Sequence, residues 1–212
     1  NYTGMNESDI QTLKNEIQKD ISGYRYIHTL SVADECIRLA KMYSLDADSS
    51  IYLQSAALLH DITKGYDTKK QIQLAKELGL TLDIDDLLCP SVLHSVTGAA
   101  YAEKFYGRYT NPIVVSAIRC HTTGKPDMST TDKLLYLADY IEPTRKHESC
   151  VYLRDYFYEN KDNLGLSVLL DRTLLKSFDL TIRHLLEDNT YIHTQTIKSR
   201  NSLIKSMHLS NQ

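Results

Sequence analysis

The sequence predicts an all-α fold, and three observations lead to this prediction. Apolar residues recur at three- and four-residue steps along most of the 212 residues, which is the spacing of one buried helix face. Strand-like alternation is nearly absent, with Thr81 to Leu87 as the one short candidate strand. The chain has only 8 glycines and 4 prolines, too few for a turn-dense β fold. We therefore expect a bundle of helices.

Glycine and proline separate the segments that carry the helical period. Gly65, Gly79 and Pro90 interrupt the first half of the chain, and glycine or proline at positions 107, 112, 124, 126 and 143 interrupts the second half. Asp132 stands three residues after Ser129 and forms an approximate capping box before the 130–142 segment. The expected helices cover residues 24–43, 50–61, 69–78, 91–106, 112–121, 130–142, 151–159 and 164–187.

The length and the absence of repeats or low-complexity linkers indicate one domain. We expect residues 1–19 to be an N-terminal helical extension, residues 20–205 to be the domain itself and residues 206–212 to be a flexible tail. Residues 1–8 should fray as well.

Composition limits the classes of function. The formal net charge is −3, and the sequence has no basic patch with interleaved aromatic residues. Nucleic acid is therefore not an expected partner. The four cysteines are widely spaced and form no C-x-x-C pair, so we expect reduced thiols and a cytoplasmic location. No run of about 18 apolar residues occurs, so we expect no membrane partner.

Histidine and aspartate recur at the polar breaks of otherwise apolar segments. A single buried histidine is more often a hydrogen-bonded core residue than a ligand. An ionised carboxylate among apolar neighbours is costly unless it is paired or binds a metal. Imidazole and carboxylate ligands suit Fe, Mn or Zn, and ligands on different helices are typical of metal sites in bundle cores. The six residues that predict this core metal site are His28, His60, Asp61, His94, His121 and Asp139.

The adjacent pair His60–Asp61 is the most specific part of this pattern. On a continuous helix the two side chains would diverge by about 100°, so they reach one ion only where the helix ends. Gly65 supplies such an ending. A carboxylate such as Asp61 can also bridge two ions about 3.5–4 Å apart.

The order H…HD…D, on His28, His60–Asp61 and Asp139, resembles the HD-domain metal-dependent phosphohydrolases. The resemblance covers about residues 20–205, and it is stronger for the symmetrical bis(5′-nucleosyl)-tetraphosphatases, the branch that hydrolyses diadenosine tetraphosphate to ADP. The segments that carry it are YIHTLSV at 26–32, ALLHDITK at 57–64, LHSVTGA at 93–99, AIRCHTTG at 117–124 and LADYIEPTR at 137–145.

The resemblance implies an HD-domain helical bundle with iron, as one or two ions, held by His28, His60, Asp61 and Asp139. Manganese or zinc is the alternative metal. His94 and His121 would then bind a second ion or the phosphates. The implied catalytic residues are Asp61, Lys64, His94, His121 and Arg145. The implied contacts to the dinucleoside polyphosphate substrate and the ADP product come from His28, Lys64, His94, His121, Thr122, Asp139, Arg145, Tyr191 and Thr196, with the segment from Tyr191 holding the nucleoside.

The cationic residues also have ordinary interpretations. Lys64 lies one helical turn beyond Asp61 and suits a phosphate oxygen, although a solvated lysine at a helix end is the default. Arg145 follows the break at Pro143 and suits a phosphate clamp, although a flexible surface arginine is the default. Arg25, three residues before His28, is a weaker candidate.

We expect a metal-dependent phosphoanhydride hydrolase that cleaves diadenosine tetraphosphate into two ADP. The sequence offers one metal cluster and one set of cations, which favours one pocket for one nucleoside diphosphate half. The alternatives are another HD activity, as a 5′-nucleotidase or dNTP hydrolase, a non-catalytic nucleotide-binding module, and a metal-free helical scaffold. The sequence leaves the oligomeric state open, with a homodimer as one option.

Overall fold

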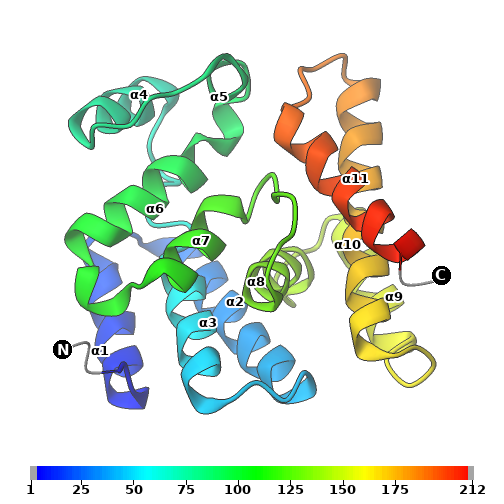
Figure 1. The fold of residues 1–212 in the computed structure, drawn as a ribbon. Helices are drawn as coiled ribbons and strands as arrows, with labels where there is room; N and C mark the ends of the chain where they lie inside the picture. Colours follow the sequence, from blue (N-terminus) through cyan, green and yellow to red (C-terminus); the bar gives the residue numbers. More distant parts are fainter. Residues whose placement is uncertain (1–3, 210–212) are drawn as a thin grey trace.

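The computed structural model describes residues 4–209, and these form eleven α-helices, three short 3-10 helices and no strand, which confirms the all-α prediction (Figure 1). All eight expected helices are present. The α-helices are α1 Glu7–Glu16, α2 Gly23–Met42, α3 Ala47–Leu59, α4 Thr68–Glu77, α5 Ile84–Leu88, α6 Leu93–Phe105, α7 Pro112–Cys120, α8 Thr130–Ile141, α9 Glu148–Glu159, α10 Leu166–Glu187 and α11 Thr194–Leu209. The 3-10 helices are η1 Ile17–Lys19, η2 Pro90–Val92 and η3 Gly107–Tyr109.

Helix α8 lies at the centre of the bundle and contacts α2, α3, α7, α9 and α10. Figure 1 shows it nearly end-on, with α9, α10 and α11 to its right and α4 and α5 at the top. The expected capping box is present, because Ser129 accepts from the Asp132 amide and Asp132 accepts from the Ser129 amide. Leu134 and Leu135 on this helix are fully buried. Each buried leucine contributes about 1.5–3 kcal/mol, so the centre of the bundle is strongly apolar.

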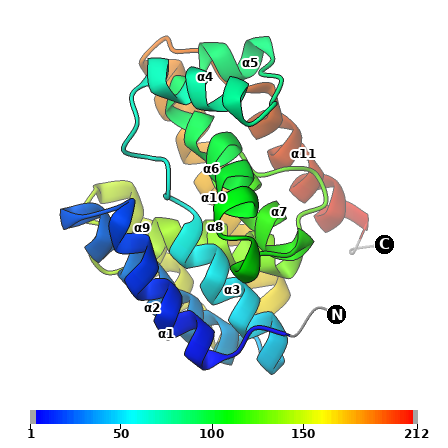
Figure 2. The ribbon, with the colours of Figure 1, turned by 90° about the vertical axis from the view of Figure 1, so that its left-hand side faces the viewer.

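The N-terminal segment is part of the same core. Asn6 caps α1, and Ile10, Leu13 and Ile17 are fully buried, with α1 packed on α3. Figure 2 shows α1 beside α2 and α3. Residues 7 and 8 are helical and Met5 is buried, so the expected fraying does not occur there. Residues 1–3 lie outside the described residues.

Two stretches differ from their sequence expectations. The candidate strand from Thr81 to Leu87 is wrong, because Asp83 and Asp86 form a capping box and start the short helix α5. The C-terminal segment forms α11, which continues to Leu209 and so passes residue 205, where we expected a flexible tail to begin. Residues 210–212 of that expected tail lie outside the described part of the chain.

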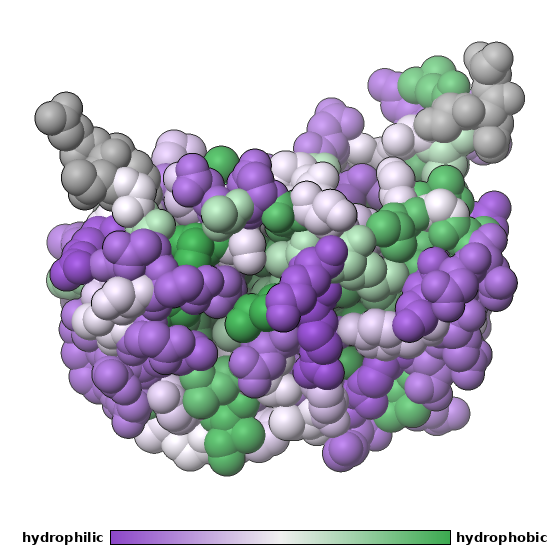
Figure 3. Space-filling view, turned by 90° about the horizontal axis from the view of Figure 1, so that it is seen from below, coloured by the Kyte–Doolittle hydropathy of each residue, from purple (hydrophilic) through white to green (hydrophobic). Residues whose placement is uncertain are grey.

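The surface seen from below mixes hydrophilic residues with separate hydrophobic patches (Figure 3). Among residues 4–209 no helix is long and apolar enough to cross a membrane.

Candidate metal centre and active site

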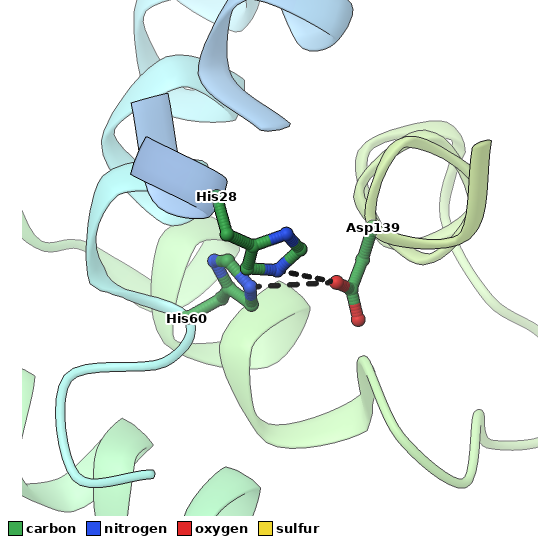
Figure 4. Close-up of side chains that lie close together, drawn as sticks. All are labelled: His28, His60 and Asp139. Carbon is green, nitrogen blue, oxygen red and sulfur yellow. Dashed lines mark ion pairs between the residues drawn. The ribbon is translucent and has the colours of Figure 1, made fainter. Parts of the chain in front are cut away.

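Helix ends bring the histidines and aspartates together. His60 and His121 are the residues at which α3 and α7 end, and His94 lies at the start of α6. His28 lies in the second turn of α2 and Asp139 in the last turn of α8. The structure therefore places all six predicted residues at one site, and Figure 4 shows His28 and His60 pointing at Asp139.

The distances within this cluster are short. Oδ1 of Asp139 lies 3.0 Å from Nε2 of His28 and 3.6 Å from Nε2 of His60. Oδ1 of Asp61 lies 3.3 Å from Nε2 of His94 and 3.7 Å from Nε2 of His121. Ligand atoms that share an ion, each about 2 Å away from it, lie about 3–4 Å from one another. The spacing therefore fits metal binding by this cluster.

Main-chain carbonyls fix the orientation of three imidazoles. The Nδ1–H of His60 donates to Ala57 O at 2.6 Å, and the Nδ1–H of His121 donates to Ile118 O at 2.6 Å. The third bond joins Nδ1–H of His94 to the carbonyl of residue 91 at 3.0 Å. A carbonyl only accepts, so each neutral ring has its proton on Nδ1 and an unprotonated Nε2 directed into the cluster.

This arrangement leaves electron-rich atoms facing one another. The Nε2 atoms of His94 and His121 are 3.1 Å apart. Nε2 of His60 is buried without a hydrogen-bond partner, and Nε2 of His28 is buried with Oδ1 of Asp139 at 3.0 Å. Buried polar atoms of this kind are rare in proteins unless an ion or water satisfies them. Imidazole nitrogens with two carboxylates are a donor set for a divalent transition metal, so the residues fit such an ion.

The two aspartates are ionised at neutral pH. Burial alone would raise the pKa of Asp61, but the positive charge that His60 can carry opposes this effect, and the pKa is held well below its usual value. The same opposition applies to Asp139, whose pKa is held well below its usual value by its histidine neighbours and Arg145. Burial lowers the pKa of His94 to about 4, so this ring is neutral. Anionic carboxylates and a neutral imidazole are the protonation states that bind metal.

Three cations border the cluster. Arg25, the weaker candidate of the sequence analysis, donates to Oδ2 of Asp61 at 2.9 Å and so contacts the cluster directly. Nζ of Lys64 lies 3.1 Å from Nε2 of His94, and the Lys64 residue is otherwise exposed. Arg145 donates from Nη2 to Oδ1 of Asp139 at 2.7 Å and from Nε to its carbonyl at 3.0 Å. Cations in these positions suit the oxygens of a phosphate chain.

Two residues of this site carried no role in the sequence analysis. Glu142, which is fully buried, accepts from Nδ1–H of His28 at 2.9 Å and from the amide of Thr144 at 2.6 Å. Arg154 donates to the carbonyls of Ile141, Glu142 and Arg145 at 2.6, 2.7 and 2.8 Å. One sequence signal could have indicated a role for Glu142: it is an acidic residue directly after the apolar helical segment that ends at Ile141.

A cavity of about 480 Å³ is lined by residues of α5, α6, α7 and the start of α11. Helix α6 also carries His94 and helix α7 ends at His121, although neither histidine lines the cavity itself. Its walls carry both charge signs. The lining residues are Asp83, Asp86, Val92, Ser95, Val96, Ser116, Arg119, Cys120, Thr123, Gly124, Lys125, His193 and Gln195.

The C-terminal segment forms one side of this cavity, although through different residues from those expected. Thr122 is hydrogen-bonded to Ser95 at 2.9 Å and lies beside the cavity. Tyr191 is 43% exposed and its hydroxyl donates to Asp85 on α5. Thr196 is buried in the first turn of α11. The lining residues from this segment are His193 and Gln195.

Close packing seats α11 against the loop after α7. Gly124 has φ +63°, and a Cβ there would lie 2.6 Å from the Phe178 ring and 2.9 Å from Oγ of Ser199. The Ser199 hydroxyl donates to the carbonyl of Thr123 at 2.9 Å. Glycine is thus required both by the backbone conformation and by the approach of α11.

The family profile of the HD domain matches residues 25–144, which hold His28, the His60–Asp61 pair and Asp139. This chain belongs to the HD-domain family. The chain is 33% identical over 195 residues to a Staphylococcus aureus protein named symmetrical bis(5′-nucleosyl)-tetraphosphatase, covering 91% of this chain and 93% of that one. A Halalkalibacterium halodurans protein with the same name is 32% identical over 89% of this chain and 93% of its own length.

A solved HD-family structure has the same overall fold. The crystal structure of a predicted HD superfamily hydrolase involved in NAD metabolism from Clostridium acetobutylicum superposes with a TM-score of 0.80 at 33% identity. It covers 92% of this chain and 97% of its own. The HD-domain assignment therefore rests on both sequence and structure.

Proposed function

We propose that this HD-domain protein is a metal-dependent hydrolase that cleaves diadenosine tetraphosphate symmetrically into two ADP. The observation that carries the proposal is the convergence of four imidazoles and two carboxylates beside three cations and one cavity. Relatives from Staphylococcus aureus, Halalkalibacterium halodurans and Bacillus subtilis named for this activity support it. The four free, buried cysteines support our further proposal of a cytoplasmic location.

We propose His28, His60, Asp61 and Asp139 as the ligands of one ion. His94 and His121 are proposed to hold a second ion or the phosphates, and iron is the proposed metal, with manganese or zinc as the alternative. When bound, such an ion lowers the pKa of water towards neutrality and neutralises phosphate charge. The buried Nε2 atom of His60, which has no hydrogen-bond partner, and the position of His28 Nε2 beside Asp139 support this ligand set.

The protein's own groups account for orientation and proton transfer. Lys64, Arg25 and Arg145 surround the cluster and can bind the phosphate oxygens on which negative charge develops. Asp61 and His94 are the candidates to accept the proton of the attacking water, because both are unprotonated at neutral pH. Water attacks one β-phosphorus, the bond to the bridging oxygen breaks, and that oxygen leaves on the second ADP. One water is consumed and, with both ADP products as trianions, two protons are released to solvent.

The limited size of the cavity on α6 and α7, the helices of His94 and His121, supports the proposal of a symmetric cut. A volume of about 480 Å³ is within the range of pockets that hold one drug-sized ligand, and a nucleoside is of that class. With one adenosine in the cavity, its β-phosphate reaches the cluster. Because the substrate is two-fold symmetric, either half can enter, and one cleavage gives two identical products.

Product analysis tests the proposal. The protein reconstituted with iron, manganese or zinc is incubated with diadenosine tetraphosphate, diadenosine triphosphate, 5′-mononucleotides and dNTPs, and early products are separated by chromatography. We expect ADP alone from the tetraphosphate and ADP plus AMP from the triphosphate. Equal ATP and AMP from the tetraphosphate would contradict the symmetric geometry, and turnover of dNTPs or mononucleotides alone would favour another HD activity. Binding without product with every metal would indicate a non-catalytic module.

A further inference from the structure

The two oxygens of Asp61 face opposite flanks of the metal cluster. Oδ1 lies 3.3 Å from Nε2 of His94 and 3.7 Å from Nε2 of His121, on the flank of α6 and α7, the two helices that also line the cavity. Oδ2 lies 2.9 Å from Nη1 of Arg25 and 3.8 Å from Nε2 of His28, both on α2. A phosphate chain that leaves the cavity and crosses the cluster therefore emerges beside the first turns of α2.

Large apolar side chains are exposed at this second flank. Tyr24 is 63% exposed and Ile27 is 57% exposed, and they are neighbours at i and i+3 on α2. The Tyr24 ring is stacked over the ring of His28, with centroids 6.4 Å apart and planes 16° apart. The His28 side chain is only 4% exposed, so Tyr24 is the solvent-accessible aromatic ring next to this candidate metal ligand.

The proposed substrate has a group that fits this surface. Two identical adenosines flank its four phosphates, and only one of them can occupy the cavity. The other must lie beyond the cluster, attached to phosphates that pass Arg25. An aromatic ring with one free face stacks readily on a nucleobase, and a branched aliphatic neighbour extends the apolar surface.

We propose that the exposed surface of Tyr24 and Ile27 is the subsite for the adenine of the departing ADP. This inference rests on the proposed function and adds a second nucleoside contact to it. The subsite binds an aromatic base by stacking and contributes to recognition of dinucleotides over mononucleotides.

A comparison of two substrates tests the subsite. Diadenosine tetraphosphate and adenosine 5′-tetraphosphate share the retained ADP half, but the second has pyrophosphate as its leaving group and no second base. For Tyr24→Ala we expect the ratio of kcat/KM for the dinucleotide to that for adenosine 5′-tetraphosphate to fall about 10-fold, the loss of one base–aromatic stack. Tyr24→Phe should restore the ratio, and Ile27→Ser should lower it by a smaller factor. Phe105→Ala, which removes an aromatic ring of similar exposure (54%) at the end of α6, is the matched control.

Loss of activity on both substrates in equal proportion would overturn the proposal, since it would mean that Tyr24 acts only through His28. Full activity of Tyr24→Ala on both substrates would overturn it as well. A second measurement does not depend on turnover. Calorimetric titration of the metal-loaded protein with ADP should give two sites in the wild type and one in Tyr24→Ala, whereas one site in both would contradict the subsite. If the wild type yields no ADP from the dinucleotide, the proposed function fails, and the titration still decides on the subsite.

Discussion

The carboxylate of Glu142 holds Nδ1 of His28 at 2.9 Å, across 114 residues of sequence. Burial opposes ionisation of Glu142, but its hydrogen bonds with His28, Ser31 and Thr144 lower its pKa to about 2. The same contact, together with Asp139, overcomes the effect of burial on His28 and raises the pKa of that ring to about 9. A carboxylate behind a ligating imidazole orients the ring and increases its basicity.

Replacing Glu142 by Gln tests this role. The amide is the same size and its oxygen still accepts from Nδ1–H, but its NH2 then faces the Thr144 amide, so the change removes the negative charge and one acceptor. We expect metal affinity to fall about 10- to 100-fold, as measured by competition with a chelator. Glu148→Gln, which changes an exposed glutamate at the start of α9, is the control and should leave the affinity unchanged.

Arg154 fixes the loop that carries Glu142 and Arg145. Lysine cannot donate in three fixed directions, so Arg154→Lys should leave buried carbonyls of this loop without donors. We expect the free energy of unfolding to drop by about 1–3 kcal/mol and metal affinity to weaken with it. Denaturant titration measures the first effect. Arg172→Lys, on the exposed face of α10, is the control, and equal stability of both variants would argue against the role of Arg154.

A carboxylate oxygen of Asp61 lies within 4 Å of Nε2 of all four histidines of the cluster. Asp61→Ala should therefore lose metal and turnover together, and its thermal stability should no longer respond to added metal. Elemental analysis of the purified variant gives the metal content directly. Full occupancy in Asp61→Ala would refute its assignment as a ligand.

Lys64 and Arg145 should behave differently when replaced. The Lys64 ammonium contacts His94, and only the main-chain amide of Lys64 contacts an aspartate, at the carbonyl of Asp61, so Lys64→Met should keep its metal and lose roughly 10²–10³-fold in rate. Arg145 is bonded to Asp139, so Arg145→Ala should lose a similar factor in rate and also weaken metal binding. Metal content and kcat/KM, measured on the same samples, separate the two effects. Unchanged kcat/KM in both variants would mean that Lys64 and Arg145 are ordinary surface cations.

The four thiols should be unreactive in the folded protein. All four are buried, and burial raises the pKa of Cys36, Cys89, Cys120 and Cys150. Since the thiolate is the reactive form, alkylation at pH 8 should be slow in the native state and should proceed at all four sites after denaturation. Mass spectrometry of samples alkylated before and after denaturation counts the modified thiols. Rapid native labelling at any site would show local opening there.

The metal cluster was predictable because its residues interrupt local apolar patterns. His60 and His121 each end a helix whose preceding residues are buried, so the polar break was visible in the sequence itself. The adjacency of Asp61 then required a helix end, which the structure has. Eight helices were predictable for the same reason, since each buries one periodic face.

The partners of these residues were not predictable, because they depend on distant segments. Arg154 reaches back by 9 to 13 residues to carbonyls that no side-chain pattern marks. Helix α11 has a weak apolar period, and it is positioned by Gly124 and Ser199, which come from segments 75 residues apart. The cavity has walls from α5, α6, α7 and the start of α11, so it exists only after the tertiary fold is complete.

The use of main-chain acceptors for His60, His94 and His121 has a consequence for mutational robustness. Every residue type carries a carbonyl, so no side-chain substitution at positions 57, 91 or 118 removes the acceptor that sets the tautomer. His28 is oriented by the side chain of Glu142. Among these four imidazoles, His28 is therefore the one whose orientation a single codon change elsewhere in the gene can remove.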